Sequence, residues 1–332
     1  MNTGHLAALT DGIGLFEHCL YDEPRTEHGY CVDDVARALI VLLRADDRSD
    51  EGRRLTETYS RFLADSQLPD GRIVNRRDTR GDWHGVPSTA DHWGRALWAW
   101  GTAVRHSRET NQSAQAYEHF RLSARRRSVF LRSMVFASLG ASQVLDVLPG
   151  NRVALAILQD TIAMLPKAPA GKWVWPEGRL TYANASVAEA MMLAGFYTER
   201  DDIFRQGRHA LEWLWQLQSV ADRLSMVPHQ GWLPGDRLPA FDQQPIEVAA
   251  LVDACQTAYD FTSDPGWLER MVTGRRWFDG WNDQSIPMHD AESGAGFDAL
   301  TLDGRNENRG AESTICFLSV DQRTENLVGA VV

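Results

Sequence analysis

The sequence predicts an all-α fold, a ring of about six helical hairpins with an inner and an outer layer, which is an (α/α)6 toroid. Apolar side chains follow helical spacing through most of the 332 residues, and nearly apolar helices alternate with amphipathic ones. The apolar helices recur at intervals of roughly 45 to 65 residues, which suits hairpins with long loops. We therefore expect residues 1–332 to form one toroidal domain.

The predicted inner helices are rich in Ala, Gly and Leu and are apolar around most of their circumference. Such helices must be buried on most sides, and their small residues permit the close packing of a ring. They are expected at Val32–Arg44, Ala90–Val104, Met134–Leu148, Ala185–Tyr197, Pro245–Phe261 and Gly310–Val320.

The predicted outer helices carry a charged stripe, which is typical of a solvated layer. They are expected at Glu51–Asp65, Ala114–Arg132, Asn151–Leu165, Asp202–Gln218, Trp267–Trp281 and a short piece after Asp321.

Long loops rich in Gly, Pro, Trp and His lead from each outer helix to the next inner helix. In a ring of antiparallel hairpins these loops all emerge at the same end, and an elaborated end favours a functional site there. They are expected at Leu68–Thr89, Lys167–Asn184, Ala221–Gln244 and Asp283–Arg309.

Composition excludes several classes of protein. A formal net charge of -11 and a pI near 5.4 argue against binding to nucleic acid or an anionic membrane. The four cysteines have no CxxC spacing, and dinucleotide, Walker and Gly-x-Ser-x-Gly motifs are absent, so no metal and no cofactor are expected. Without a leader-like or membrane-spanning segment, a cytoplasmic location is expected by default. The oligomeric state is left open.

Acidic residues recur where the predicted inner helices begin, on the end that carries the long loops. We interpret Asp91 as a helix cap and Asp253, deeper along its helix, as a core polar contact. Several carboxylates converging on one ring axis would raise one pKa and leave another carboxylate ionised, which is the arrangement that glycoside cleavage needs. The helix-start set is Asp33, Asp34, Glu247 and Glu312.

Glu177 adds a carboxylate in a loop flanked by tryptophans, an apolar setting that suits a general acid. The long loops hold further tryptophans, and such rings stack on sugar faces. The sequence therefore predicts acid/base catalysis by Asp33 or Asp34, Glu177 and Glu312.

Five segments, taken in order, resemble a bacterial family of the six-hairpin glycosidase superfamily whose members are often labelled glycosyltransferases. Some members are fused to or encoded beside sugar-transferring or mannoside-processing enzymes. The chain departs from the family pattern at Val35 and Ala183, where that pattern has Asn and Asp. The Asp33–Asp34 pair also resembles the aspartate pair of endo-α-mannanases. The segments are HGYCVDDVARAL (28–39), DHWGRALW (91–98), WPEGRLTYANA (175–185), DQQPIE (242–247) and GAEST (310–314).

The resemblance implies hydrolysis or phosphorolysis of a glycosidic bond in an oligosaccharide or glycoside substrate. Two alternatives stay open: a sugar epimerase or isomerase acting through His92 and His229, and a noncatalytic carbohydrate-binding accessory protein of a glycosyltransferase system. The residues expected to bind sugar are His28, Tyr30, Arg37, His92, Trp93, Arg95, Trp175, Tyr182, Asn184, Asp242, Gln243 and Glu247.

Overall fold

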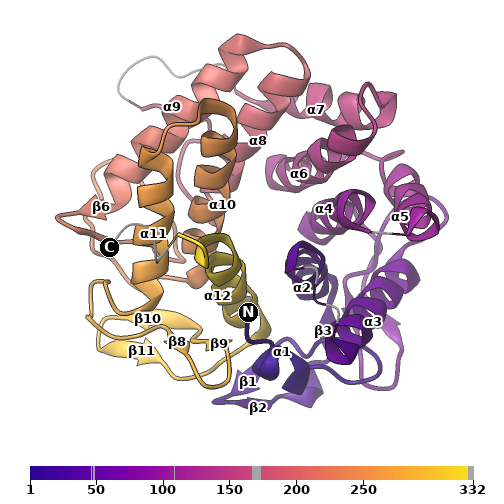
Figure 1. The fold of residues 1–332 in the computed structure, drawn as a ribbon, viewed down its shortest axis with the longest axis horizontal. Helices are drawn as coiled ribbons and strands as arrows, with labels where there is room; N and C mark the ends of the chain where they lie inside the picture. Colours follow the sequence, from indigo (N-terminus) through magenta and orange to yellow (C-terminus); the bar gives the residue numbers. More distant parts are fainter. Residues whose placement is uncertain (46, 48, 108, 167–172, 328–332) are drawn as a thin grey trace.

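The computed structural model describes residues 1–45, 47, 49–107, 109–166 and 173–327. Six inner helices follow one another around the centre of a ring, and the last of them packs against the first, so the ring is closed (Figure 1). The predicted (α/α)6 toroid is thus confirmed. The inner helices are α2 (Val32–Ala45), α4 (Asp91–His106), α6 (Leu131–Val147), α8 (Ala185–Tyr197), α10 (Pro245–Thr262) and α12 (Ala311–Thr324).

In the part of the chain that the structure describes, five outer helices each pack against the inner helix that precedes them. They are buried along one stripe only: in the first of them the stripe includes Leu55, Tyr59 and Phe62. By contrast, eleven of the thirteen residues of α8 are buried. The outer helices are α3 (Asp50–Ser66), α5 (Thr110–Ser123), α7 (Arg152–Met164), α9 (Asp201–Gln218) and α11 (Gly266–Phe278).

The prediction of a sixth outer helix after Asp321 is wrong. Within the described residues, α12 continues through Asp321 to Thr324, and the short helix α1 (Gly4–Ala8) packs against it instead. The sixth outer position is therefore filled by a helix from the other end of the chain, which local periodicity cannot predict.

The expected end of the second outer helix is also wrong. Helix α5 ends at Ser123, whereas Arg132 lies in the first turn of α6. This difference matters because Arg132, from the first turn of α6, donates a hydrogen bond to the backbone of the loop that precedes α8.

Helix starts are defined by local side chains. The Ser49 hydroxyl accepts a hydrogen bond from Gly52 N at the start of α3 (2.9 Å), and Asn151 Oδ1 accepts from the second and third residues of α7 (3.1 Å each). Pro245 occupies the first turn of α10, where its missing N–H costs nothing. These signals set the position at which each long loop becomes a helix.

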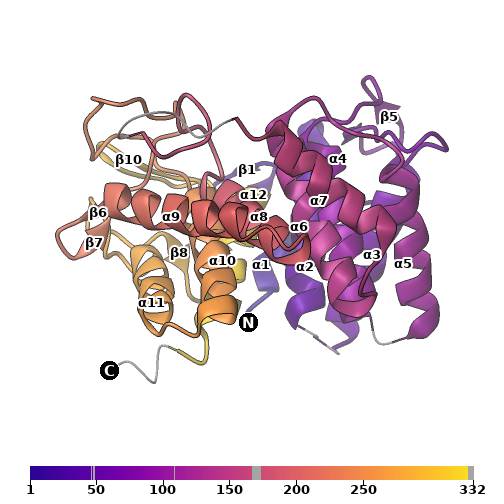
Figure 2. The same ribbon diagram turned by 90° about the horizontal axis from the view of Figure 1, so that it is seen from above.

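Short antiparallel strands stiffen the long loops. Figure 2 shows β5 and β10 with their loops along one face of the ring, and the N-terminus toward the other. None of the described helices combines the length and apolarity needed to cross a bilayer. The strands are β1 (Cys19–Leu20), β2 (Glu23–Pro24), β3 (Tyr30–Cys31), β4 (Arg76–Arg77), β5 (Trp83–His84), β6 (Ser219–Val220), β7 (Arg223–Leu224), β8 (His289–Asp290), β9 (Ala295–Gly296), β10 (Ala299–Thr301) and β11 (Gly304–Asn306).

Inner helices α4 and α6 approach closely through glycines. A Cβ added at Gly101 would lie 2.1 Å from the carbonyl oxygen of Gly140, and one added at Gly140 would lie 2.2 Å from that of Leu97. Both distances are far shorter than a van der Waals contact. The atoms concerned belong to the backbone, so they cannot move aside as a flexible side chain would. The spacing of the two helices therefore depends on these positions.

We expect Gly140→Ala to lower the free energy of unfolding by about 1–3 kcal/mol, because the added methyl group overpacks the α4–α6 contact. The matched control is Gly12→Ala, since a Cβ at Gly12 meets nothing within 4 Å. Urea unfolding followed by circular dichroism measures both. Equal stability of the two variants would contradict the close approach.

Candidate functional site

A cavity of about 650 Å³ opens at the end of the ring where the inner helices begin. Helices α2, α4, α10 and α12 each contribute residues from their first turns, and the long loops complete the walls. Of the predicted site residues, the cavity brings together Asp33, Asp34, Arg37, Arg95, Tyr182, Asp242 and Glu312.

Arg37 holds two of the acidic side chains at the base of this cavity. Its guanidinium donates to Glu312 Oε2 (2.7 Å) and to Asp34 Oδ1. Arg37 and Asp34 are 8% and 3% exposed, whereas the Glu312 side chain is 39% exposed. One cation thus links a buried carboxyl to one that faces the cavity.

The two carboxyls have opposite pKa shifts. Burial raises the pKa of Asp34, an effect that the charge of Arg37 opposes and that of Glu312 reinforces. Burial also acts to raise the pKa of Glu312, but the charge and hydrogen bond of Arg37 outweigh it and lower that pKa. The environment therefore moves the pKa of Asp34 above its ordinary value and that of Glu312 below it.

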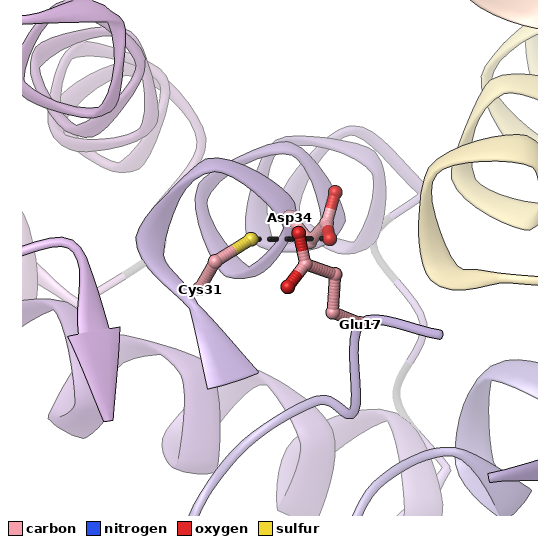
Figure 3. A group of neighbouring side chains, drawn as sticks. All are labelled: Glu17, Cys31 and Asp34. Atoms are coloured by element: carbon pink, nitrogen blue, oxygen red, sulfur yellow. Dashed lines mark hydrogen bonds between the residues drawn. The ribbon is translucent and has the colours of Figure 1, made fainter. Parts of the chain in front are cut away.

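Asp34 also belongs to a cluster of possible metal ligands with Glu17 and Cys31 (Figure 3). One ligand atom of each lies within 4.8 Å of the others, and the Cys31 thiol donates to Asp34 Oδ2 (3.1 Å). However, Glu17 is paired with Arg76, and burial raises the pKa of the Cys31 thiol well above its usual value. The donor set is thus a neutral thiol with two carboxylates that arginines already compensate, which fits a hydrogen-bonded cluster better than a metal site.

A second acidic group lies on the wall formed by α4. Asp91, expected as a cap, instead accepts hydrogen bonds from Ser133 Oγ (2.9 Å) and from the Tyr182 hydroxyl. Ala90 occupies the N-cap position without a side-chain bond. Nearby, Asp33 Oδ1 lies 3.3 Å from Arg95 Nε. Asp91 therefore ties the loop before α8 to the start of α4.

Glu177, predicted as the general acid, lies outside the cavity lining. Its Oε2 accepts from Arg132 (2.6 Å) and lies 3.3 Å from the Trp175 indole nitrogen. Arg132 also donates to the backbone carbonyl of Ala183 (3.0 Å). In this structure Glu177 thus anchors the arginine that holds the Tyr182 loop.

Asn184 and Glu247 form a buried pair beneath the same loop. Asn184 Nδ2 donates to Glu247 Oε2 (2.9 Å), and Asn184 Oδ1 accepts from Thr181 N (2.9 Å). Burial raises the pKa of Glu247. Both side chains support the loop from below rather than lining the cavity.

Several other residues expected to contact sugar are buried elsewhere. Trp93 and Trp175 have no exposed surface, because Trp93 packs in the core and donates to Ser123 O (3.3 Å). Gln243 is also fully buried and donates to Asp283 Oδ2 (2.8 Å). The expectation that these side chains contact a ligand disagrees with their positions.

The remaining expected contacts, His28, Tyr30 and His92, do not line the cavity. Tyr30 is buried and donates to Asp11 Oδ2 (2.6 Å). His92 is buried, with its Nε2 3.2 Å from Ile73 O, and burial lowers its pKa. His28 is exposed and packs edge-on against His18.

Asp242 is the one predicted sugar contact whose carboxylate is left free. Within the described residues, it makes no hydrogen bond or ion pair through its side chain, although its backbone carbonyl accepts from His229 N (2.8 Å). Both residues line the cavity. A free carboxylate in the lining of an acidic cavity is available to hydroxyl groups or water.

Sequence reasoning missed several lining residues that come from irregular segments. Asp298 accepts from Gly310 N (2.8 Å) and Ser313 Oγ (2.6 Å), which fixes the start of α12. Glu17 and His18 come from the segment before β1. The loop that holds Asp298 was expected on this face, but nothing in its local sequence singles out that residue.

No protein-family model and no curated protein matches the chain. Solved structures do. A sugar epimerase from a ruminal bacterium is 13% identical, with a TM-score of 0.72 over 97% of this chain and 95% of that chain. A cellobiose 2-epimerase from Spirochaeta thermophila is 12% identical, with a TM-score of 0.68 over 97% and 93%.

A GH76 α-mannanase from Bacteroides thetaiotaomicron is 9% identical, with a TM-score of 0.64 over 98% of this chain and 94% of that chain. These neighbours share the (α/α)6 toroid fold with this chain over nearly its whole length. At such low identity the likeness shows the fold alone.

We expect Arg37→Gln to destabilise the protein at pH 7 by about 3–5 kcal/mol, because Asp34 would be left buried without its cation. The lowered pKa of Glu312 contributes stability above its unfolded pKa of about 4.3, and this is lost as the pH falls through the lower folded value. The deficit of the variant should therefore shrink between pH 7 and pH 3.5 in chemical denaturation.

The matched control for this prediction is Arg76→Gln, which removes an arginine whose side chain is 48% exposed. Its effect should be below about 1 kcal/mol. A deficit in Arg37→Gln that stays constant with pH would contradict the electrostatic account.

Proposed function

We propose that the chain cleaves a glycosidic bond of an oligosaccharide or glycoside bound in the loop-end cavity. The observation that carries this proposal is the convergence of carboxylates from separate elements on one cavity. Glu17, Asp33, Asp34, Asp91, Asp242, Asp298 and Glu312 all line it. The (α/α)6 scaffold that it shares with sugar-processing enzymes supports the same class of substrate.

The pKa shifts suggest the acid and base roles. Asp34, whose pKa burial raises, would donate a proton to the leaving oxygen as the bond to the anomeric carbon breaks. Glu312, whose pKa Arg37 holds low, would accept a proton from the water that attacks that carbon. Phosphate in place of water would give phosphorolysis. Pairs of carboxyls with separated pKa values are how glycoside cleavage runs near neutral pH.

Binding and positioning would fall to the surrounding groups. The free carboxylate of Asp242 suits hydrogen bonds from sugar hydroxyls, and Arg95 and Tyr182 line the cavity beside it. Glu177 would act as a positioning residue, because its contact with Arg132 anchors the Tyr182 loop. This assigns Glu177 a different role from the general acid that the sequence suggested.

An epimerase remains a second candidate because two histidines line the cavity. His18 and His229 are both exposed there, and a ring nitrogen could remove a proton from a carbon next to a sugar carbonyl. His92, the other histidine considered from the sequence, is buried away from the lining. The epimerase alternative would therefore depend on His18 and His229.

We expect the purified protein to release reducing sugar from at least one of a panel of manno- and gluco-oligosaccharides, with phosphate present and absent. Asp34→Asn and Glu312→Gln should each lower kcat about 10²- to 10⁴-fold, because each removes one proton-transfer group. Asp303→Asn, on an exposed loop residue outside the lining, is the matched control and should retain full activity.

The same panel separates the two candidates. Conversion of a free sugar to its epimer that is lost in His229→Asn but retained in Glu312→Gln would replace cleavage with epimerisation. Unchanged cleavage in both carboxylate variants would rule out the proposed apparatus.

A further inference from the structure

The ring has a second large cavity, at the end opposite the candidate active site. It encloses about 710 Å³ and is lined by residues from all six inner helices. Arg44, Arg105, Asp146, Tyr197, Asp260 and Arg323 come from the last turns of their helices, whereas the first cavity is lined by first turns. A space of only about 50 Å³ lies between the two, bordered by Arg37 and Arg44.

Most charges around this second cavity are already compensated by protein partners. Asp253, as expected for a core polar contact, accepts from Arg44 (3.1 Å) and Arg323 (2.9 Å). Arg105 is paired with Asp146 at 2.5 Å. The site therefore offers little net charge to an ionic ligand.

Glu189 is the exception, because part of its carboxyl has no partner. The side chain lines the cavity and the residue is only 5% exposed. Its Oε1 accepts from Thr257 Oγ1 (3.0 Å), but Oε2 is buried without any hydrogen bond. A buried polar atom without a partner has lost its hydration without compensation, so a ligand that supplied a hydrogen bond there would be stabilised.

Burial and the nearby charge of Asp253 raise the pKa of Glu189 to about 8. At neutral pH the carboxyl is therefore mostly protonated and can donate as well as accept. A protonated carboxyl pairs well with a hydroxyl group, which has both a donor and acceptors.

Apolar ring faces lie in the same cavity. Phe196 is 53% exposed and packs on Phe261 with ring centroids 4.4 Å apart. Trp98 and Tyr197 complete the aromatic part of the lining. Exposed ring faces next to polar groups favour a ligand with both C–H faces and hydroxyls.

We propose that this cavity, lined by Glu189 and Phe196, is a second binding site that takes an uncharged polyhydroxylated ligand, a carbohydrate. Because the charges around the cavity are compensated, an ionic ligand is disfavoured. The unpartnered carboxyl oxygen of Glu189 can form a hydrogen bond with a hydroxyl group, and the aromatic ring faces can pack against C–H groups. The inference does not rest on cleavage at the other end of the ring.

The other titratable groups near Glu189 do not share its pKa of about 8. Burial lowers the pKa of His106 to about 4, and the two arginines lower that of Asp253. Among the described residues, α7 and α9 contribute no side chain to the cavity. The titratable and charged groups that line the cavity with Glu189 are Arg44 (α2), Arg105 and His106 (α4), Asp146 (α6), Asp260 (α10) and Arg323 (α12). Asp253 (α10) does not line it, but its charge acts on Glu189.

The test is calorimetric titration of the full chain with glucose, mannose, cellobiose and mannobiose, in an Asp242→Asn background that weakens the first cavity. If the protonated carboxyl is the binding form, affinity falls as pH rises through about 8. Between pH 6.5 and pH 9.5 the loss should be about 30-fold. Glu189→Gln, which keeps a neutral donor, should bind with little change across this range.

Two further variants make the outcome decisive. Glu189→Leu should abolish this binding, and Phe196→Ala, on an exposed ring, should weaken it up to about tenfold. Binding by none of the four sugars, binding unaffected in both variants, or an equal pH dependence in Glu189→Gln would each overturn the proposal. Asp34→Asn, which should lose cleavage activity, should still bind sugar in the second cavity. The binding proposal and the cleavage proposal can therefore be tested independently.

Discussion

The ion pair between Arg37 and Glu312 joins the first and last inner helices, which are 275 residues apart in the chain. Because α12 packs against α2, this pair lies where the ring closes, and it places both carboxyls of the proposed acid/base pair. Removing the closure would separate Asp34 from Glu312 and leave the base of the cavity open. Fold and proposed chemistry thus depend on the same contact.

A cation between two carboxyls has a consequence for their protonation. A guanidinium stabilises both ionised forms, but burial opposes ionisation more strongly at Asp34, which is 3% exposed, than at Glu312, whose side chain is 39% exposed. Neighbouring charges add to this difference in exposure, because Glu312 and Asp33 raise the pKa of Asp34 whereas Arg95 and His18 lower that of Glu312.

The two helix layers could be predicted from the sequence, because a helix buried on most sides must be apolar and a partly exposed one amphipathic. Helix α8 has no charged residue except Glu189, and its bounds agree with those expected from its apolar run. The sixth outer position was not predictable, since α1 fills it from the far end of the chain. Convergence of the helix-start carboxylates followed from the common direction of the inner helices. Whether a loop tryptophan faces solvent or core depends on tertiary packing, and Trp175 became part of the core.

The two ends of the ring differ electrostatically for a reason that the topology supplies. Helix N-termini, which carry partial positive charge, meet at the first cavity and favour carboxylates there. The last turns of the inner helices carry partial negative charge and favour cations, and Arg44, Arg105 and Arg323 are found near that end. Arg44 and Arg323 in turn hold Asp253 ionised, and its charge helps to keep Glu189 protonated. A ring of parallel inner helices thus gathers carboxylates at one end and balances arginines against aspartates at the other.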